Sequence, residues 1–235
     1  MIKSDVIIIA GGLGKRLREV VTDVPKPLAP VGGAPFLDIL LRQLDRSGCI
    51  NRAVLAIGYL GEQIVSTYQN RKDFGFGIEF SMEESPLGTG GAIIKALSHT
   101  DGTFILAMNG DSFVDIDYSR LLAFHNEHDG KMTMVLRNVS DANRYGLVEL
   151  NDSHRIKGFS EKKSVTCGGL INAGVYVFDR DLFKESSENI RVSLEEDLIP
   201  KFLPYGVYGL ISVGKFIDIG VPGTYQIAHS YLKES

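Results

Sequence analysis

The stretch Val6-Ile7-Ile8-Ile9-Ala10-Gly11-Gly12-Leu13-Gly14-Lys15-Arg16-Leu17 decides the fold of this 235-residue chain. Its first four residues form a continuous β-branched run, which is typical of a strand buried on both faces of a parallel sheet. The glycines that follow let the backbone approach a ligand closely, and the N–H groups of such a turn can surround a phosphate. The stretch therefore indicates an α/β sheet whose first strand leads into a glycine-rich loop.

Two common phosphate loops do not match this glycine-rich stretch. The Walker A pattern G-x-x-x-x-G-K-[ST] needs a glycine and a hydroxyl residue at the positions where this chain has Ile9 and Arg16. The dinucleotide pattern G-x-G-x-x-G fails as well, because Leu17 stands at its last position. Taken alone, the loop fits a phosphate site and a purely structural turn equally well.

Apolar runs and helical stripes alternate through the first half of the chain. They predict strands at 6–9, 53–57, 78–81 and 103–107, and helices at 35–47, 62–68 and 90–97. The second half adds strands at 132–136, 147–150, 155–159 and 174–178, and helices at 193–202 and 224–232. This order predicts βαβ units on a mostly parallel sheet, with an antiparallel part beside it, in one domain spanning residues 1–235.

The composition is that of an ordinary globular protein, with 44% hydrophobic and 23% charged residues. A formal net charge of −4 argues against a nucleic-acid or anionic-membrane partner. The N-terminal apolar run is too short for a signal peptide or a membrane span. Cys49 and Cys167 form neither a disulfide framework nor a metal-binding spacing, so we expect a cytoplasmic protein.

Lys26 stands between two prolines in Pro25-Lys26-Pro27. Each proline fixes its own φ and disfavours helix just before it, which stiffens the backbone around the lysine. A lysine that must meet a phosphate gains from such preorganisation. A proline-marked turn with a solvated lysine is the alternative.

Two aspartates stand where a metal site is expected. Asp111 follows a predicted strand, and ligands gather at the carboxyl ends of parallel strands, although a simple turn aspartate is as common there. Asp218 lies inside a predicted apolar strand, Phe216–Gly220, where an unpaired carboxylate is costly to bury. Two carboxylates with substrate phosphates would suit Mg²⁺, which usually takes few protein ligands.

Other polar residues give weaker signals. Glu161 and Lys162 close a predicted strand and would point to opposite faces, as on a solvated edge. Asn172 puts an amide near the same region. His125 and His128 share a helical face without partners in ligand spacing, which favours a solvated helix.

These motifs occur in the order of a known family. They are Gly11-Gly12-x-Gly14-x-Arg16-Leu17, Pro25-Lys26-Pro27, Pro86–Gly90, Gly110-Asp111, Tyr145-Gly146, Glu161-Lys162, Asn172-Ala173-Gly174 and Asp218-Ile219-Gly220. Each one is a weak signal, whereas eight in order are specific. From about residue 5 to 225 the chain resembles the sugar-1-phosphate nucleotidyltransferases.

The resemblance implies a Rossmann-like, three-layer α/β fold of the nucleotidyltransferase (GT-A-like) type, with a mixed, mostly parallel central sheet. It implies catalysis by Arg16, Lys26 and Asp111, and Mg²⁺ held by Asp111 and Asp218. The implied nucleotide-binding residues are Gly11, Gly12, Gly14, Lys15, Glu83, Gly88 and Thr89. The implied sugar-phosphate-binding residues are Gly146, Glu161, Lys162 and Asn172. Lys15 departs from the family, which usually has Thr there.

The implied reaction joins two anions, a nucleoside triphosphate and a sugar 1-phosphate. Mg²⁺ and the cations neutralise their repulsion while the sugar phosphate attacks the α-phosphorus, and no covalent enzyme intermediate is needed. These two substrates are the expected partners, and a homo-oligomer is left open.

Within the family, the motifs look most like those of D-glycero-α-D-manno-heptose-1-phosphate guanylyltransferases, which make GDP-heptose for surface polysaccharides. A carboxylate such as Glu83 can accept from both N1–H and N2–H₂ of guanine, whereas uracil and thymine offer a single N–H. Against this, Glu83 fits a surface residue equally well, and Ser85 stands where the subgroup tends to have Glu.

We therefore expect transfer of GMP from GTP to the heptose 1-phosphate. One alternative is uridylyl or thymidylyl transfer to a hexose or N-acetylhexosamine 1-phosphate. The other is a non-catalytic sugar-nucleotide sensor.

Overall fold

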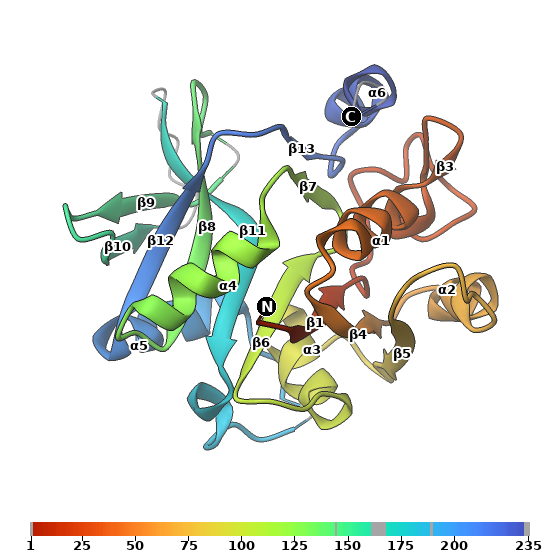
Figure 1. Ribbon diagram of the computed structural model, residues 1–235. Coiled ribbons are helices and arrows are strands. Elements are labelled where there is room, and N and C mark those ends of the chain that lie inside the picture. The colour runs from red at the N-terminus through yellow and green to blue at the C-terminus, as the bar shows by residue number, and fades with distance from the viewer. Residues whose placement is uncertain (1, 144, 161–167, 189, 233–235) are drawn as a thin grey trace.

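A nine-stranded sheet forms the centre of the computed structural model, which describes residues 2–143, 145–160, 168–188 and 190–232 (Figure 1). Its strands are β1 (Ser4–Ile9), β4 (Ile50–Ile57), β5 (Gly77–Met82), β6 (Phe104–Asn109), β8 (Met132–Val139), β9 (Leu147–Leu150), β10 (Ile156–Ser160), β11 (Gly169–Asp179) and β12 (Val207–Ser212). They run in the order β10-β9-β11-β6-β1-β4-β5, and β8 lies between β11 and β12.

The sheet is parallel in its first half and mixed in its second. Strands β6, β1, β4 and β5 pair in parallel. Strand β11 then pairs antiparallel with β6 and with β8, and β9 pairs antiparallel with β10. This arrangement confirms the predicted α/β fold with a mixed, mostly parallel sheet. The prediction of one domain over residues 1–235 stays a prediction, which the continuity of the sheet supports.

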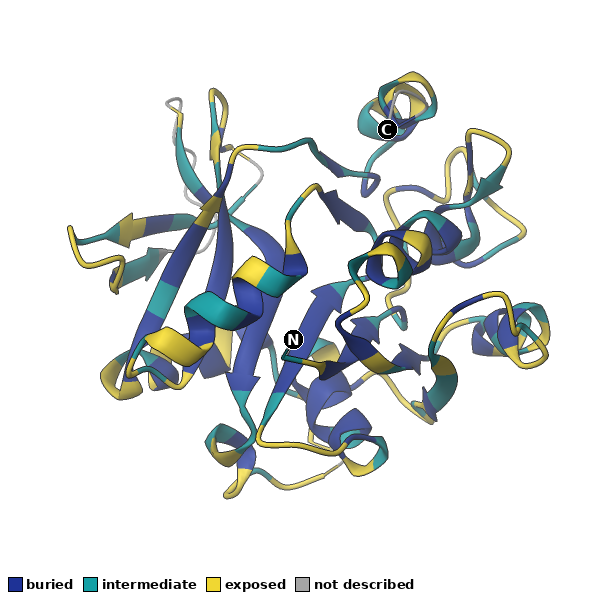
Figure 2. Cartoon of the chain, in the orientation of Figure 1, coloured by how far each residue is buried: buried dark blue, intermediate teal, exposed yellow. Residues whose placement is uncertain are grey.

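Helices cover both faces of the sheet. They are α1 (Phe36–Ser47), α2 (Gly61–Tyr68), α3 (Gly88–Ala96), α4 (Tyr118–Glu127), α5 (Ile199–Phe202) and α6 (Pro222–Tyr231). Helices α1 and α4 lie in front of the sheet in Figure 1, and α3 lies behind it. Val6 and Ile8 of β1 belong to the core on the α1 face, whereas Ile7 belongs to the core on the α3 face. Successive side chains of a strand thus feed opposite layers, and the interior of the sheet is buried throughout (Figure 2).

Helix α1 illustrates how the sequence sets these layers. Leu37, Leu40, Leu41 and Leu44 are fully buried on one side of the helix, as the helical stripe predicted. The helix ends at Gly48, whose φ of 65° is the left-handed conformation that closes many helices.

The remaining elements are short. They are β2 (Pro30–Val31) with β3 (Ala34–Pro35), β7 (Ser112–Val114) with β13 (Phe216–Asp218), the 3-10 turns η1 (Lys26–Leu28), η2 (Leu97–His99), η3 (Arg180–Phe183) and η5 (Leu203–Tyr205), and the π-turn η4 (Leu194–Leu198). The helix predicted at 193–202 is therefore η4 followed by α5. None of the helices in the described ranges is long and apolar enough to cross a membrane.

The interpretation of His125 as part of a solvated helix is wrong. Its side chain is buried in α4 against β8, with Nδ1 lying 2.9 Å from the hydroxyl of Thr133. His125 and its neighbours do lie on a helix, but the sequence did not indicate that the face carrying His125 packs against the sheet.

Candidate active site

The glycine loop leaves the carboxyl end of β1 and packs against the turn after β4. A Cβ atom at Gly11 would lie 2.9 Å from Glu83 Oε1 and 3.1 Å from the backbone nitrogen of Gly58, so a larger residue would have to displace Glu83 and press on the turn after β4. Gly14 has a φ of 60°, and its carbonyl then accepts from the backbone N–H groups of Leu17 and Arg18. The loop thus turns sharply beside the ends of β1 and β6. Gly12, Lys15 and Arg16 are exposed on it.

Lys26 and Asp111 form an ion pair at the centre of this edge. Lys26 Nζ lies 2.5 Å from Asp111 Oδ2, and the two side chains are 12% and 34% exposed. The hydroxyl of Ser112 donates to the other oxygen of Asp111, at 3.2 Å. Lys26 begins η1 between its two prolines, so its backbone is held at the point where its ammonium meets the carboxylate. The lysine is therefore partly buried and paired with Asp111, so the alternative of a solvated lysine is wrong, while its contact with a phosphate stays a prediction.

Asp218 is brought beside Asp111 by the short ladder between β13 and β7. Asp218 opposes Ser112 in that ladder, and the backbone N–H of Ile219 donates to the carbonyl of Asp111 at 2.9 Å. The backbone N–H of Gly220 also donates to Asp218 Oδ1. The backbones of two aspartates that are distant in sequence are therefore neighbours at one edge of the fold.

The two aspartates suit a hard divalent cation. In the described part of the chain, no group of three or more His, Cys, Asp and Glu side chains could hold a metal. A pair of carboxylates without nitrogen or sulfur ligands fits Mg²⁺, which takes oxygen ligands and completes its shell with water and substrate phosphates. The same set does not fit structural zinc, which needs four protein ligands.

Glu83 follows β5 and faces the glycine loop. Its Oε2 accepts from the backbone N–H of Leu87 at 2.9 Å, and its Oε1 faces Gly11. Burial raises the pKa of Glu83 above its ordinary value, because a charged carboxylate loses solvation there. The neighbouring Glu84 is exposed. Glu83 is thus partly buried against the glycine loop, and the alternative of an exposed surface residue is wrong for it.

Gly88 and Thr89 open α3 next to the same loop. Gly88 has a φ of 75°, and a Cβ on it would lie 2.7 Å from the carbonyl oxygen of Val192. Thr89 lies beyond it and reaches Glu195, to which its hydroxyl donates at 2.6 Å. The start of α3 is therefore packed directly against the segment that leads into η4.

Two adjoining cavities open at this edge. The smaller, about 150 Å³, is lined by Gly12, Gly14, Lys26 and Asp111 among others. The larger, about 600 Å³, is lined by Arg16, Gly88, Gly146 and Asn172 among others. Thr89 and Asn109 border both cavities. The cavity walls thus include four residues of the predicted nucleotide group, Gly12, Gly14, Gly88 and Thr89, and two of the predicted sugar group, Gly146 and Asn172. Gly11, Lys15 and Glu83 line neither cavity.

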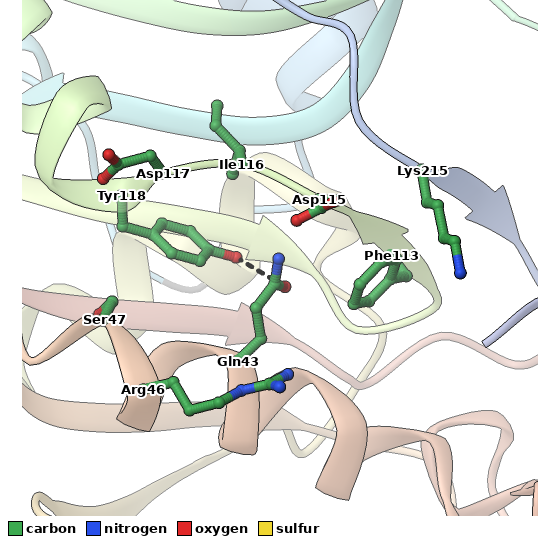
Figure 3. Close-up of a pocket in the computed structure, with 9 residues that line it drawn as sticks. All are labelled: Gln43, Arg46, Ser47, Phe113, Asp115, Ile116, Asp117, Tyr118 and Lys215. Atoms are coloured by element: carbon green, nitrogen blue, oxygen red, sulfur yellow. Dashed lines mark hydrogen bonds between the residues drawn. The ribbon is translucent and has the colours of Figure 1, made fainter. Parts of the chain in front are cut away.

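A separate cavity of about 370 Å³ lies between α1 and the segment after β7 (Figure 3). Gln43, buried in α1, donates to the backbone carbonyl of Val114 and accepts from the hydroxyl of Tyr118. None of the site residues predicted from the sequence lines this cavity. This cavity is therefore distinct from the edge that carries Lys26 and Asp111.

The sugar-phosphate group of predicted residues is placed only in part. Asn172 lies on β11, where its Nδ2 donates to the hydroxyl of Tyr176 at 2.7 Å and its Oδ1 accepts from the backbone N–H of Gly174. Gly146 precedes β9 and accepts from the backbone N–H of Asn172. Glu161 and Lys162 lie outside the described residues.

Several residues of the larger cavity were not predicted from the sequence, among them Asn109, Arg191 and Glu195. The side-chain oxygen of Asn109 is buried, and no described group donates to it. Asn109 had a signal, since it directly precedes Gly110-Asp111. Arg191 and Glu195 had none, because only the fold brings their segment against α3.

This arrangement can neutralise and hold a polyphosphate. Arg16 supplies positive charge at the larger cavity and the paired Lys26 at the smaller one, and the two aspartates can supply oxygen ligands for a cation. Such groups stabilise charge on a transferring phosphoryl centre without themselves forming bonds to it.

Comparison with known proteins extends over nearly the whole chain. A family model described as nucleotidyl transferase matches residues 5–225. The D-glycero-alpha-D-manno-heptose 1-phosphate guanylyltransferase of Aneurinibacillus thermoaerophilus is 39% identical over 230 residues, covering 97% of this chain and 98% of that protein. The protein of the same name from Campylobacter jejuni is 36% identical over 219 residues, covering 93% and 96%. The solved structure of HddC from Yersinia pseudotuberculosis complexed with GMP-PN has a TM-score of 0.86 and 30% identity, covering 97% and 99%.

Proposed function

This chain belongs to the nucleotidyl transferase family, and we propose that it transfers GMP from GTP to D-glycero-α-D-manno-heptose 1-phosphate. The products are pyrophosphate and a GDP-sugar for surface polysaccharide synthesis. The observation that carries the proposal is the Lys26–Asp111 pair, with Asp218 beside it on β13, at a hollow bordered by the glycine loop. The names of the relatives support GTP and the heptose phosphate as the substrates.

Family members typically use a divalent metal ion, and we propose Mg²⁺ here, held by Asp111 and Asp218. When bound, the ion would neutralise part of the negative charge of the substrate phosphates. The fit of two carboxylates to this ion supports the choice of Mg²⁺.

The protein residues divide the remaining work between the two substrates. The backbone of Gly11, Gly12 and Gly14 surrounds the nucleotide phosphates, with Lys15 adding positive charge at the loop. Arg16 stabilises the charge that grows on the leaving pyrophosphate, and Lys26 holds the α-phosphate. A phosphate oxygen of the sugar phosphate attacks the α-phosphorus, and the bond from that phosphorus to the β-phosphate oxygen breaks. Lys162 holds the attacking phosphate, while Gly146, Glu161 and Asn172 orient the sugar.

The guanine base is assigned to the side of the loop where Glu83, Gly88 and Thr89 gather. The Glu83 carboxylate accepts one backbone hydrogen bond, and each carboxylate oxygen can accept more than one. It therefore keeps the capacity to accept from guanine N1–H and N2–H₂.

The cytoplasm is the proposed compartment of the reaction. Cys49, the free cysteine among the described residues, is buried as a thiol, which agrees with a reducing environment.

The proposal predicts that Asp111→Asn abolishes turnover while leaving the fold intact. The amide keeps the shape of the carboxylate but removes the charge that pairs with Lys26 and holds the metal ion. Pyrophosphate release with Mg²⁺, GTP and the sugar phosphate measures the effect, and circular dichroism checks the fold. Asp152→Asn, an exposed turn position, is the matched control and should retain full activity. Normal turnover in the Asp111→Asn variant would contradict the proposed site.

A further inference from the structure

Glu195 is a carboxylate in the wall of the larger cavity. It belongs to η4, a segment that carries no motif, and it lines the larger cavity together with Thr89 and Asn172. Thr89 belongs to the proposed nucleotide side and Asn172 to the proposed sugar side. The carboxylate of Glu195 is connected to both of them by hydrogen bonds.

On the nucleotide side, the connection is direct. The hydroxyl of Thr89 donates to Glu195 Oε2 at 2.6 Å, and the backbone N–H of Leu194 donates to the Thr89 oxygen at 2.9 Å. The hydroxyl of Ser193 donates to the same Oε2 at 3.3 Å. Thr89 is thus held between a donor and an acceptor of the η4 segment, which fixes the rotamer of the residue next to Gly88.

On the sugar side, the connection passes through Tyr176. The hydroxyl of Tyr176 donates to Glu195 Oε1 at 3.3 Å and accepts from Asn172 Nδ2 at 2.7 Å. Tyr176 is fully buried. Because Asn172 Oδ1 also accepts from the backbone N–H of Gly174 at 3.0 Å, its amide is fixed in one orientation. Its second amide hydrogen is then left for a ligand in the cavity.

A carboxylate at position 195 offers an acceptor oxygen to each of these two hydroxyl groups. Both of its oxygens accept, from Thr89 on one side and from Tyr176 on the other. A carboxamide offers a single acceptor oxygen, so glutamine could satisfy only one side. The backbone places the group, because Val192 exchanges hydrogen bonds with Leu87 and with Gly90 and Gly91 of α3.

We propose that Glu195 is a positioning residue that sets Thr89 and Asn172 together and so couples nucleotide binding to sugar-phosphate binding. This inference rests on the proposed function, because it assigns the two ends of the hydrogen-bonded chain to the two substrates. Glu195 acts through its neighbours and takes no part in bond making.

The test compares the Michaelis constants of both substrates across four variants. Glu195→Gln should raise at least one KM roughly tenfold or more, as expected for loss of a hydrogen bond to a charged group. Tyr176→Phe should raise the KM for the sugar phosphate and leave that for GTP within about twofold, because it breaks only the sugar side. Thr89→Val should raise the KM for GTP, and Thr89→Ser, which keeps the hydroxyl, should restore it.

Coupling is read from the combined variants. In the Glu195→Gln background, Tyr176→Phe should raise the KM for the sugar phosphate by a smaller factor than it does in the wild type, because the hydrogen bond between Tyr176 and residue 195 is already lost. Glu185→Gln, an exposed position before η4, is the control and should match the wild type. Thermal unfolding of each variant separates a change in KM from a loss of fold.

The outcomes are distinguishable from failure of the proposed function. Wild-type turnover is measured first, and its absence with every substrate pair removes the proposed function and the inference with it. Normal wild-type turnover with both KM values unchanged in Glu195→Gln overturns the inference alone. A Glu195→Gln variant that only unfolds at a lower temperature, with unchanged KM values, overturns it as well.

Discussion

Glu83 shows how a single carboxylate acquires its properties from the fold. The side chain is part-buried between Gly11 and the backbone N–H of Leu87, and this burial raises its pKa. The sequence offered only an acidic pair, Glu83-Glu84, in which the two members looked alike. Which of them points inward is decided by the turn after β5, because successive residues leave a strand on opposite faces.

The raised pKa of Glu83 leads to a prediction about pH. Only the charged form accepts both hydrogen bonds from guanine, and a raised pKa means that the charge is lost at a higher pH than for an ordinary glutamate. The KM for GTP should therefore rise as the pH falls through this pKa. At neutral pH, Glu83→Gln should raise the KM for GTP roughly 5- to 150-fold, as expected for a bidentate contact to a base.

The neighbouring glutamate provides the control. Glu84→Gln should leave the KM for GTP and its pH dependence as in the wild type, because Glu84 is exposed. A Glu83→Gln enzyme with the wild-type KM and the same dependence on pH would show that this carboxylate does not meet the base.

Helix α4 and strand β8 are joined through a neutral histidine. His125 is buried, and burial lowers its pKa from 6.5 to about 4. The unfolded chain binds a proton at this residue below about pH 6.5, whereas the folded chain does so only near pH 4. Its contribution to stability is therefore complete above about pH 6.5 and is lost as the pH falls toward 4.

The lowered pKa of His125 predicts that acid weakens the packing of α4 against β8. Between about pH 7.5 and about pH 5, His125 should account for a loss of about 2 kcal/mol in the free energy of unfolding. Urea unfolding at the two pH values measures the total change, to which carboxylates also contribute. His125→Gln removes the histidine term alone, so the variant should lose about 2 kcal/mol less than the wild type over the same interval. Equal losses in the two proteins would contradict a neutral buried His125.

The elements themselves were predicted unevenly. Strands with continuous β-branched runs, such as β1, and helices with a clear apolar stripe, such as α1, were predicted from local pattern alone. Strand β12 was missed although its residues are largely apolar, because Gly209 interrupts its pattern. That glycine has a packing reason, since a Cβ there would lie 2.5 Å from the side chain of Leu136.

At the scale of the whole molecule, the site depends on contacts that no local pattern contains. The motifs indicated that Asp111 and Asp218 belong together, but only the β7–β13 ladder explains how. Strand β13 was predicted as the apolar strand that holds Asp218, whereas β7 was not predicted, because its three residues carry too little pattern. Glu195 was not predicted from the sequence, because its role depends on the docking of residues 190–193 against α3.

The central claim is that this hollow transfers a nucleotide to a sugar phosphate. It is tested most directly by measuring pyrophosphate release, with Mg²⁺, for each pairing of GTP, ATP, UTP and dTTP with heptose, mannose, glucose and N-acetylhexosamine 1-phosphates. The account predicts the highest kcat/KM for GTP with D-glycero-α-D-manno-heptose 1-phosphate. Preference for UTP or dTTP would contradict the assignment of the base, and binding of nucleotide without pyrophosphate release from any pairing would identify a sensor and contradict the claim itself.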